Sequence, residues 1–147
     1  MLELIWGKKT DAMMDVWTIE HLLSGISVGM FVILTNRRIL SRFGDEVPSE
    51  KSMLSFDLVG VMFLAFLWET FEHYLETGLA GERVEFWFQG VEFWANRLIF
   101  DPLMLVLGYL LVRKFPKIVL PARILSIIWL VVHVFVFPHS MYLHEIF

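Results

Sequence analysis

The chain has 147 residues, of which 57% are hydrophobic and 16% aromatic, and its formal net charge is −4. A mean hydropathy of +0.65 is too apolar for an ordinary soluble domain of this length. The chain has no cysteine, which excludes disulfides and thiolate metal sites. The composition therefore predicts an all-α integral membrane protein, with residues 1–147 forming a single domain.

Four segments approach the roughly 20 apolar residues that a helix needs to cross a bilayer. In chain order they cover residues 17–35, 57–75, 98–112 and 118–137, and we expect them to form a four-helix transmembrane bundle. The connection between the second and third segments, residues 76–96, is rich in Phe and Trp. Because such rings settle at the headgroup level, we expect this connection to form an interfacial segment that covers one end of the bundle.

Lysine and arginine side chains near helix ends indicate orientation, because they resist transfer across the membrane. Eight of the twelve follow the first or third segment, namely Arg37, Arg38, Arg42, Lys51, Arg113, Lys114, Lys117 and Arg123. The other four are Lys8, Lys9, Arg83 and Arg97. We therefore expect a multipass protein of a bacterial inner (plasma) membrane, with both termini and residues 76–96 on the non-cytoplasmic side.

The first segment contains Gly25-x-x-x-Gly29, flanked by small serines. Small residues at this spacing allow two membrane helices to approach closely. The pattern predicts helix packing and carries no chemistry of its own.

The second segment ends in a polar stripe. Glu69, Glu72, His73 and Glu76 stand at i, i+3, i+4 and i+7, which places them on one face of a helix. Charged groups at membrane depth turn inward, pair with one another and favour a functional site. The last of the four, Glu76, is expected to be solvated at the membrane interface.

Residues of the other segments are expected at the same depth. Counting along each helix from its inner end places Glu69, Asp101 and His133 about 18 Å from that end, and places His21 close to the level of Glu72. The four segments thus contribute polar groups to one layer near the non-cytoplasmic rim. The tail residues His139 and His144 are expected at the surface.

Carboxylate and imidazole ligands without thiolates suit zinc, iron or manganese, and ligands spaced along one helix can reach a single ion. We therefore predict a divalent metal site. Its candidate ligands are His21, Glu69, Glu72, His73, Asp101 and His133. Two other interpretations stay open: the same groups could relay protons, or they could form interhelical hydrogen bonds that hold the bundle together.

Three further polar residues are expected beside these ligands. Glu92 and Asn96 are four apart, as are Arg97 and Asp101, so each pair can meet on a helix. Arg97 is the best counter-charge for the acids of the second segment. A salt bridge between Arg97 and Asp101 is the alternative.

The order of these residues resembles a family of small bacterial inner-membrane proteins that is classed as a domain of unknown function. The resemblance covers about residues 21–116. It is carried by His21 and Gly25, Trp68-Glu69-x-x-Glu72, Glu82-Arg83, Asn96-Arg97-Leu98 with Asp101, Leu107-Gly108-Tyr109-Leu110-Leu111, Arg113 and Pro116.

More remotely, the chain is similar to VanZ-like membrane proteins, which are associated with the cell envelope and glycopeptide resistance. The resemblance implies a four-helix inner-membrane protein in which His21, Glu69, Glu72, Asn96 and Asp101 occupy positions typical of the family. It implies no particular activity or cofactor. This chain has His73 where the family more often has Asn.

Three functions fit these observations. The first is a metal-dependent activity on the cell envelope or a lipid-linked substrate, in which the metal activates water. The second is a non-catalytic subunit that binds a protein partner or a second copy of the chain. The third, a proton or ion transporter, is disfavoured because four helices barely enclose a path. Whether the chain is an enzyme stays open. Membrane lipids are expected around it, and nothing basic is arranged for nucleic acid.

Overall fold

The structure is a computed structural model that describes residues 2–43, 48–88 and 90–136. Within them the chain forms helices and no strands, as the all-α prediction requires. The long helices are α2 (Val16–Phe43), α3 (Glu50–Glu76), α5 (Asp101–Lys114) and α6 (Val119–Val131). The short elements are α1 (Leu2–Ile5), α4 (Glu82–Phe88), the π-helices η1 (Asn96–Phe100) and η3 (Val132–Val136), and the 3₁₀ turn η2 (Pro116–Ile118).

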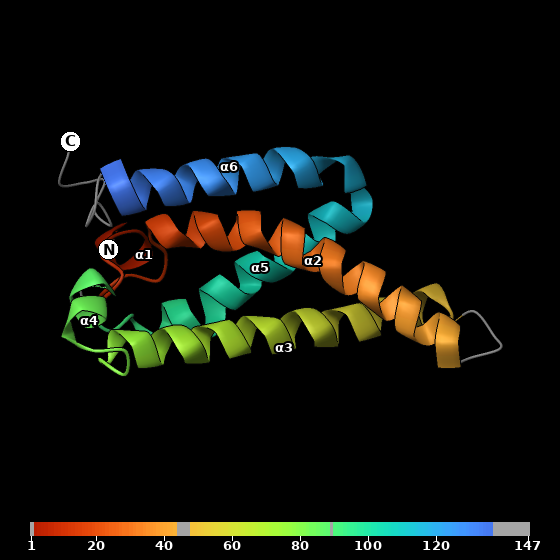
Figure 1. Cartoon of the computed structure of the whole chain (residues 1–147), viewed down its shortest axis with the longest axis horizontal. Coiled ribbons are helices and arrows are strands. Elements are labelled where there is room, and N and C mark those ends of the chain that lie inside the picture. Colours follow the sequence, from red (N-terminus) through yellow and green to blue (C-terminus); the bar gives the residue numbers. More distant parts are fainter. Residues whose placement is uncertain (1, 44–47, 89, 137–147) are drawn as a thin grey trace.

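The long helices run alongside one another, with α2 and α5 pointing one way and α3 and α6 the other (Figure 1). The helices α1 and α4 lie at the end of the bundle where α2 begins and α3 finishes (Figure 1). We call this the α4 end and the opposite one the Arg113 end. The π-helices η1 and η3 extend α5 and α6 at the α4 end.

Among the described residues, two helices are long and apolar enough to cross a membrane, judged by length and composition alone. They are Val16–Arg42 and Glu50–Glu76, each of 27 residues. The predicted segments 17–35 and 57–75 lie within them. The predicted segments 98–112 and 118–137 fall on η1 with α5 and on η2, α6 and η3, apart from residue 137, which is outside the described residues.

Helices α2 and α5 are in backbone contact through glycine. A Cβ atom on Gly25 would lie 2.4 Å from the carbonyl oxygen of Leu105, and one on Gly108 would lie 2.5 Å from that of Leu22. No side chain fits at either position. The close approach predicted from Gly25 and Gly29 is therefore confirmed, and the partner helix is α5.

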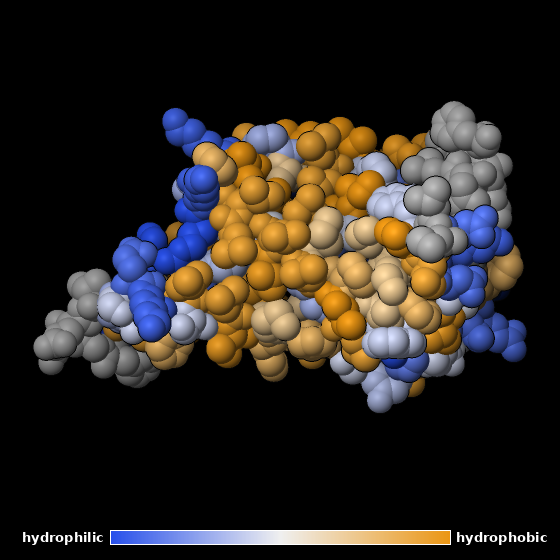
Figure 2. Space-filling model, turned by 180° about the vertical axis from the view of Figure 1, so that it is seen from behind, coloured by the Kyte–Doolittle hydropathy of each residue, from blue (hydrophilic) through white to orange (hydrophobic). Residues whose placement is uncertain are grey.

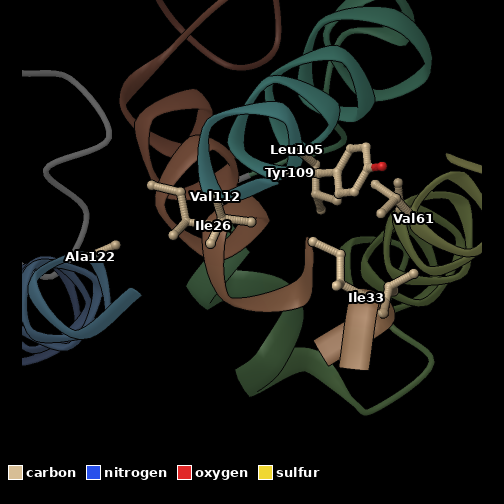
Figure 3. Packing of buried hydrophobic residues seen from close by; sticks show 9 residues of the cluster. Ile26, Ile33, Val61, Leu105, Tyr109, Val112 and Ala122 are labelled. Carbon is tan, nitrogen blue, oxygen red and sulfur yellow. The ribbon is translucent and has the colours of Figure 1, made fainter. Parts of the chain in front are cut away.

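Buried apolar side chains from all four long helices form one core cluster, with Ile26, Val61, Leu105 and Ala122 as representatives (Figure 3). The outer surface is also apolar. On the face in Figure 2, hydrophobic residues form a broad band between two hydrophilic ends. Large exposed apolar side chains include Phe31, Val59, Phe63, Leu103 and Leu120. A soluble monomer rarely exposes so much apolar surface, so this band is typical of a surface covered by lipid or protein.

At the Arg113 end, a polar network joins three helices. The carboxylate of Asp57 accepts hydrogen bonds from Asn36 Nδ2 at 2.9 Å, from Tyr109 Oη at 3.3 Å and from Arg113 Nη1 at 3.0 Å. The guanidinium also donates to Glu50 Oε2 at 2.8 Å. Both oxygens of Asp57 have donors, so this network holds α2, α3 and α5 together.

Candidate metal centre

Three polar side chains from three helices meet near the α4 end. His21 Nε2 of α2 lies 3.0 Å from Glu69 Oε1 of α3, and His21 Nδ1 lies 3.5 Å from Asp101 Oδ2 at the start of α5. One ligand atom from each residue lies within 4.8 Å of the other two. The residues are 6%, 2% and 0% exposed, respectively. We call this group the His21 centre.

The helix itself fixes the orientation of the His21 ring. Nδ1 lies 3.0 Å from the carbonyl oxygen of Trp17, one turn earlier in α2. Because a carbonyl oxygen only accepts, we assign the hydrogen to Nδ1. Nε2 is then left with a lone pair or a second proton, and it faces Glu69. Metal-binding histidines typically have their second nitrogen held by a carbonyl in this way.

The carboxylates of the His21 centre lack donors. Within the described part of the chain, neither oxygen of Glu69 and neither oxygen of Asp101 has a hydrogen-bond partner. His21 Nε2 nevertheless lies 3.0 Å from Glu69 Oε1, an ion pair when the imidazole is protonated. Buried carboxylates without donors are costly unless a proton or a cation neutralises them.

The spacing within the centre suits a metal. Ligand atoms about 2.0–2.2 Å from an ion are roughly 3.0–3.5 Å apart when they occupy neighbouring positions. The 3.0 Å between His21 Nε2 and Glu69 Oε1 lies in this range. A group that unites His21, Glu69 and Asp101 could therefore hold a metal ion, and its identity is open.

The other three predicted ligands lie outside this group. Glu72 is half-buried, and its charge interacts with those of His21 and Glu69. The Nδ1 atom of His73 is hydrogen-bonded to Arg97 Nη1. His133 is buried on η3 and faces α2. The described residues therefore bring three of the six predicted ligands into one cluster.

His133 lies among tryptophans. Its ring centre is 4.6 Å from that of Trp129 and 5.4 Å from that of Trp17, and its Nδ1 lies 2.8 Å from the carbonyl oxygen of Trp129. The ring thus packs in the contact between α6 and α2. The predicted surface histidines His139 and His144 lie outside the described residues.

A second polar group lies beside the centre, and its hub is Asn96, which is fully buried. The Nδ2 atom of Asn96 donates to Glu92 Oε1 at 2.9 Å and to Asp15 Oδ2 at 3.3 Å. Its Oδ1 accepts from Thr18 Oγ1 at 3.4 Å. The predicted pairing of Glu92 with Asn96 is present. Thr18 is one turn before His21 and links this group to the centre.

Asp15 and Thr18 were missed by the sequence analysis. Asp15 caps α2, since its Oδ1 accepts from the backbone nitrogens of Trp17 at 2.7 Å and Thr18 at 3.2 Å. Thr18 Oγ1 accepts from the backbone nitrogen of Asp15 at 3.0 Å. Asp-x-x-Thr before an apolar run is a helix-start signal that could have located both residues.

The burial of Glu76 shows that the sequence prediction for this residue was wrong. It was expected to be solvated, yet it is 1% exposed. Lys9 Nζ lies 2.5 Å from Glu76 Oε1, and the backbone nitrogen of Glu92 donates to Glu76 Oε2 at 3.1 Å. The reason is that residues 6–15, which we call the N-terminal segment, fold over the end of α3 and exclude water from it.

Acids outnumber bases at this end. The buried acids are Asp15, Glu69, Glu76, Glu92 and Asp101, and the buried bases beside them are Lys9 and His21. Burial raises the pKa of Glu92, and the nearby carboxylates raise it further. Burial also raises the pKa of Asp15, against the effect of its two backbone hydrogen bonds. The excess of buried carboxylates at this end therefore favours a bound proton or cation.

No protein-family model, curated protein or solved structure matches the chain. The family resemblance drawn from the sequence thus stays a prediction. The described residues define an all-helical fold with a buried histidine–carboxylate centre and with two helices long and apolar enough to cross a membrane.

Proposed function

We propose that this chain is a multipass membrane protein that binds a divalent metal ion through His21, Glu69 and Asp101. One observation carries the proposal: two buried carboxylates lie beside His21, Glu69 at Nε2 and Asp101 at Nδ1, and a backbone carbonyl fixes the orientation of the ring. A divalent ion would neutralise both carboxylates and take up the free lone pair of the imidazole.

The membrane assignment rests on the two long apolar helices and on the hydrophobic band of Figure 2. We propose that the segments formed by α5 and α6 cross the membrane alongside α2 and α3. The Arg113 end carries eight of the twelve lysines and arginines and is assigned to the cytoplasm. The His21 centre then lies near the opposite face.

The donor set favours zinc, iron or manganese. Three protein ligands leave a position for water, as in hydrolytic zinc sites, and a bound metal supplies acidity to that water. Glu72 is the next carboxylate along α3, and its charge interacts with those of His21 and Glu69. We therefore favour hydrolysis or transfer on a substrate that reaches the site from the outer leaflet, such as a lipid-linked one.

An assembly role is the second candidate, and α3 favours it. Only 22% of its apolar window is buried within the chain. A helix that turns most of its apolar surface outward is suited to pack against a transmembrane helix of a partner or of a second copy. In that role the His21 centre would fix the helix packing without chemistry.

Metal analysis of the full-length protein, purified in detergent after growth with zinc, iron and manganese, tests the proposal. We expect about one ion per chain. Glu69→Gln and Asp101→Asn should each lose it, because each removes one charged ligand. The matched control is Glu50→Gln, which changes an exposed glutamate on the same helix and should keep the metal. A folded wild-type protein without metal would contradict the proposal and leave the assembly role.

A further inference from the structure

We propose that the metal reaches the His21 centre by a polar route at the α4 end, and that Lys9 closes this route as a gate. The gate regulates the proposed metal centre and rests on that function. The route itself rests on hydrogen bonds and burial within the described residues, so it can be tested without metal.

The route follows a chain of buried polar groups. It runs from Thr18, one turn before His21, to Asn96, then to Glu92 and finally to Glu76, with a hydrogen bond at each step. A cation loses water at little cost only where such groups replace it, whereas the apolar sides of the bundle make passage expensive. The hydrophobic band of Figure 2 illustrates that barrier.

Lys9 lies at the outer end of this series of hydrogen-bonded groups, beside Glu76. Its ammonium is paired with Glu76 and lies 5.2 Å from the ring centre of Phe88. Its carbonyl oxygen accepts from the backbone nitrogen of Phe93 at 2.7 Å. A tethered cation thus occupies the place where an incoming cation would first meet the carboxylates. Like charges repel, so the ammonium must withdraw before a metal ion passes.

Few side chains hold the N-terminal segment against the bundle. The helix α1 before it has only four residues. The apolar side chains Leu4, Ile5 and Trp6 are exposed and contribute little packing. Besides Lys9, the fully buried side chains of the segment are the small Ala12 and the capping Asp15. The ion pair with Glu76 therefore anchors the segment to α3, and opening is expected to leave Asp15 in place as the cap of α2.

Thiol labelling tests the gate. Because the natural chain has no cysteine, a Thr18→Cys variant carries a single thiol on the route. We measure its reaction with a small cationic methanethiosulfonate in the full chain in nanodiscs. Adding Lys9→Met or Glu76→Gln should speed labelling about tenfold or more, because each change leaves one buried charge unpaired. Lys117→Met, an exposed lysine at the Arg113 end, should not change the rate.

Two further thiols keep this test decisive. Ala95→Cys, buried beside Asn96, repeats it if Thr18→Cys fails to fold. Val61→Cys lies in the apolar core and should stay unreactive in every background. Equal labelling of Thr18→Cys with and without Lys9 would overturn the gate. Faster labelling of Val61→Cys with Lys9→Met would overturn it too, since the whole bundle would then have loosened.

A second measurement uses Zn²⁺. In the zinc-loaded protein, Lys9→Met should release the ion to EDTA about tenfold faster or more, while the zinc bound at equilibrium changes much less. Unchanged release together with unchanged labelling would reject the gate. If no variant binds zinc or another metal, the proposed function fails, and the labelling rates alone decide whether Lys9 closes the route.

Discussion

Gly25 of α2 and Leu105 of α5 touch through their backbones, with only 2.4 Å between a hypothetical Cβ on the glycine and the carbonyl oxygen of Leu105. The two helices run parallel, so residues one turn earlier on each also face one another. Those residues are His21 and Asp101, which lie 3.5 Å apart. The glycine contact therefore sets the separation of two members of the His21 centre.

Gly25→Ala tests this link. The added methyl must push α5 away, and overpacking of this kind costs about 1–3 kcal/mol of stability. It should also lower metal affinity, because Asp101 moves with α5. Thermal unfolding and metal content are the measurements. Gly60→Ala on α3 is the control, since the atoms nearest its Cβ belong to side chains, Val32 Cγ1 at 3.0 Å and Asn36 Nδ2 at 3.8 Å, and not to the backbone of another helix. Full metal content in a destabilised Gly25→Ala protein would contradict the link.

The Asp57 network predicts an asymmetry between its two charges. Arg113→Gln should cost about 3–5 kcal/mol, because it leaves a carboxylate that is 1% exposed without its cation. Asp57→Asn should cost less, about 1–2 kcal/mol, because the Arg113 side chain is 26% exposed and can turn to water. Unfolding of both variants in detergent checks the order. Equal costs would mean that Asp57 finds other compensation.

Glu92 should make stability depend on pH. Its pKa is raised in the folded chain by burial and by the carboxylates of Asp101, Glu72, Asp15 and Glu69. The folded state therefore keeps a proton that the unfolded state releases above its ordinary pKa of 4.5, so the contribution of this group is most favourable at low pH and declines as pH rises above that value.

Glu92→Gln removes this titration and keeps the oxygen that accepts from Asn96. The melting temperature of the variant should exceed that of the wild type by an amount that grows between about pH 5 and pH 8. Melting curves across this range, without added metal, provide the measurement. Parallel curves for the two proteins would mean that Glu92 ionises normally in the folded chain.

Substituting two histidines in turn distinguishes a metal ligand from a neighbouring polar residue. His21→Ala should abolish metal binding, because it removes the only nitrogen in the three-residue group. His73→Ala should retain the metal, because the partner of His73 is Arg97. Metal content per folded chain distinguishes the two. Loss of metal in His73→Ala alone would place the site further along α3.

The sequence was informative where a regular helix extends through the bundle. The i, i+3 and i+7 spacing on α3 correctly placed Glu69 on the inner face, and counting along the helices correctly placed Asp101 near it. The Gly25 pattern predicted close packing. These inferences need only the α-helical period and a common membrane depth.

Other features depend on local departures from that period. The alternative pairing of Arg97 with Asp101 assumed an α-helix, whereas η1 is a π-helix, in which residues four apart no longer align. Arg97 contacts His73 instead. Lys9 and Glu76 are 67 positions apart in the sequence, and no periodic pattern predicts a contact between residues so far apart.

The contacts of Lys9 also determine when, during synthesis of the chain, the N-terminal segment can reach its final position. Lys9 leaves the ribosome long before Glu76, and Phe93, which holds its backbone, follows later still. The N-terminal segment therefore cannot take its final place until α3 and the start of α5 have been made. Until then Lys9 and Glu76 stay unpaired, and this end of the bundle closes only after the start of α5 has been made.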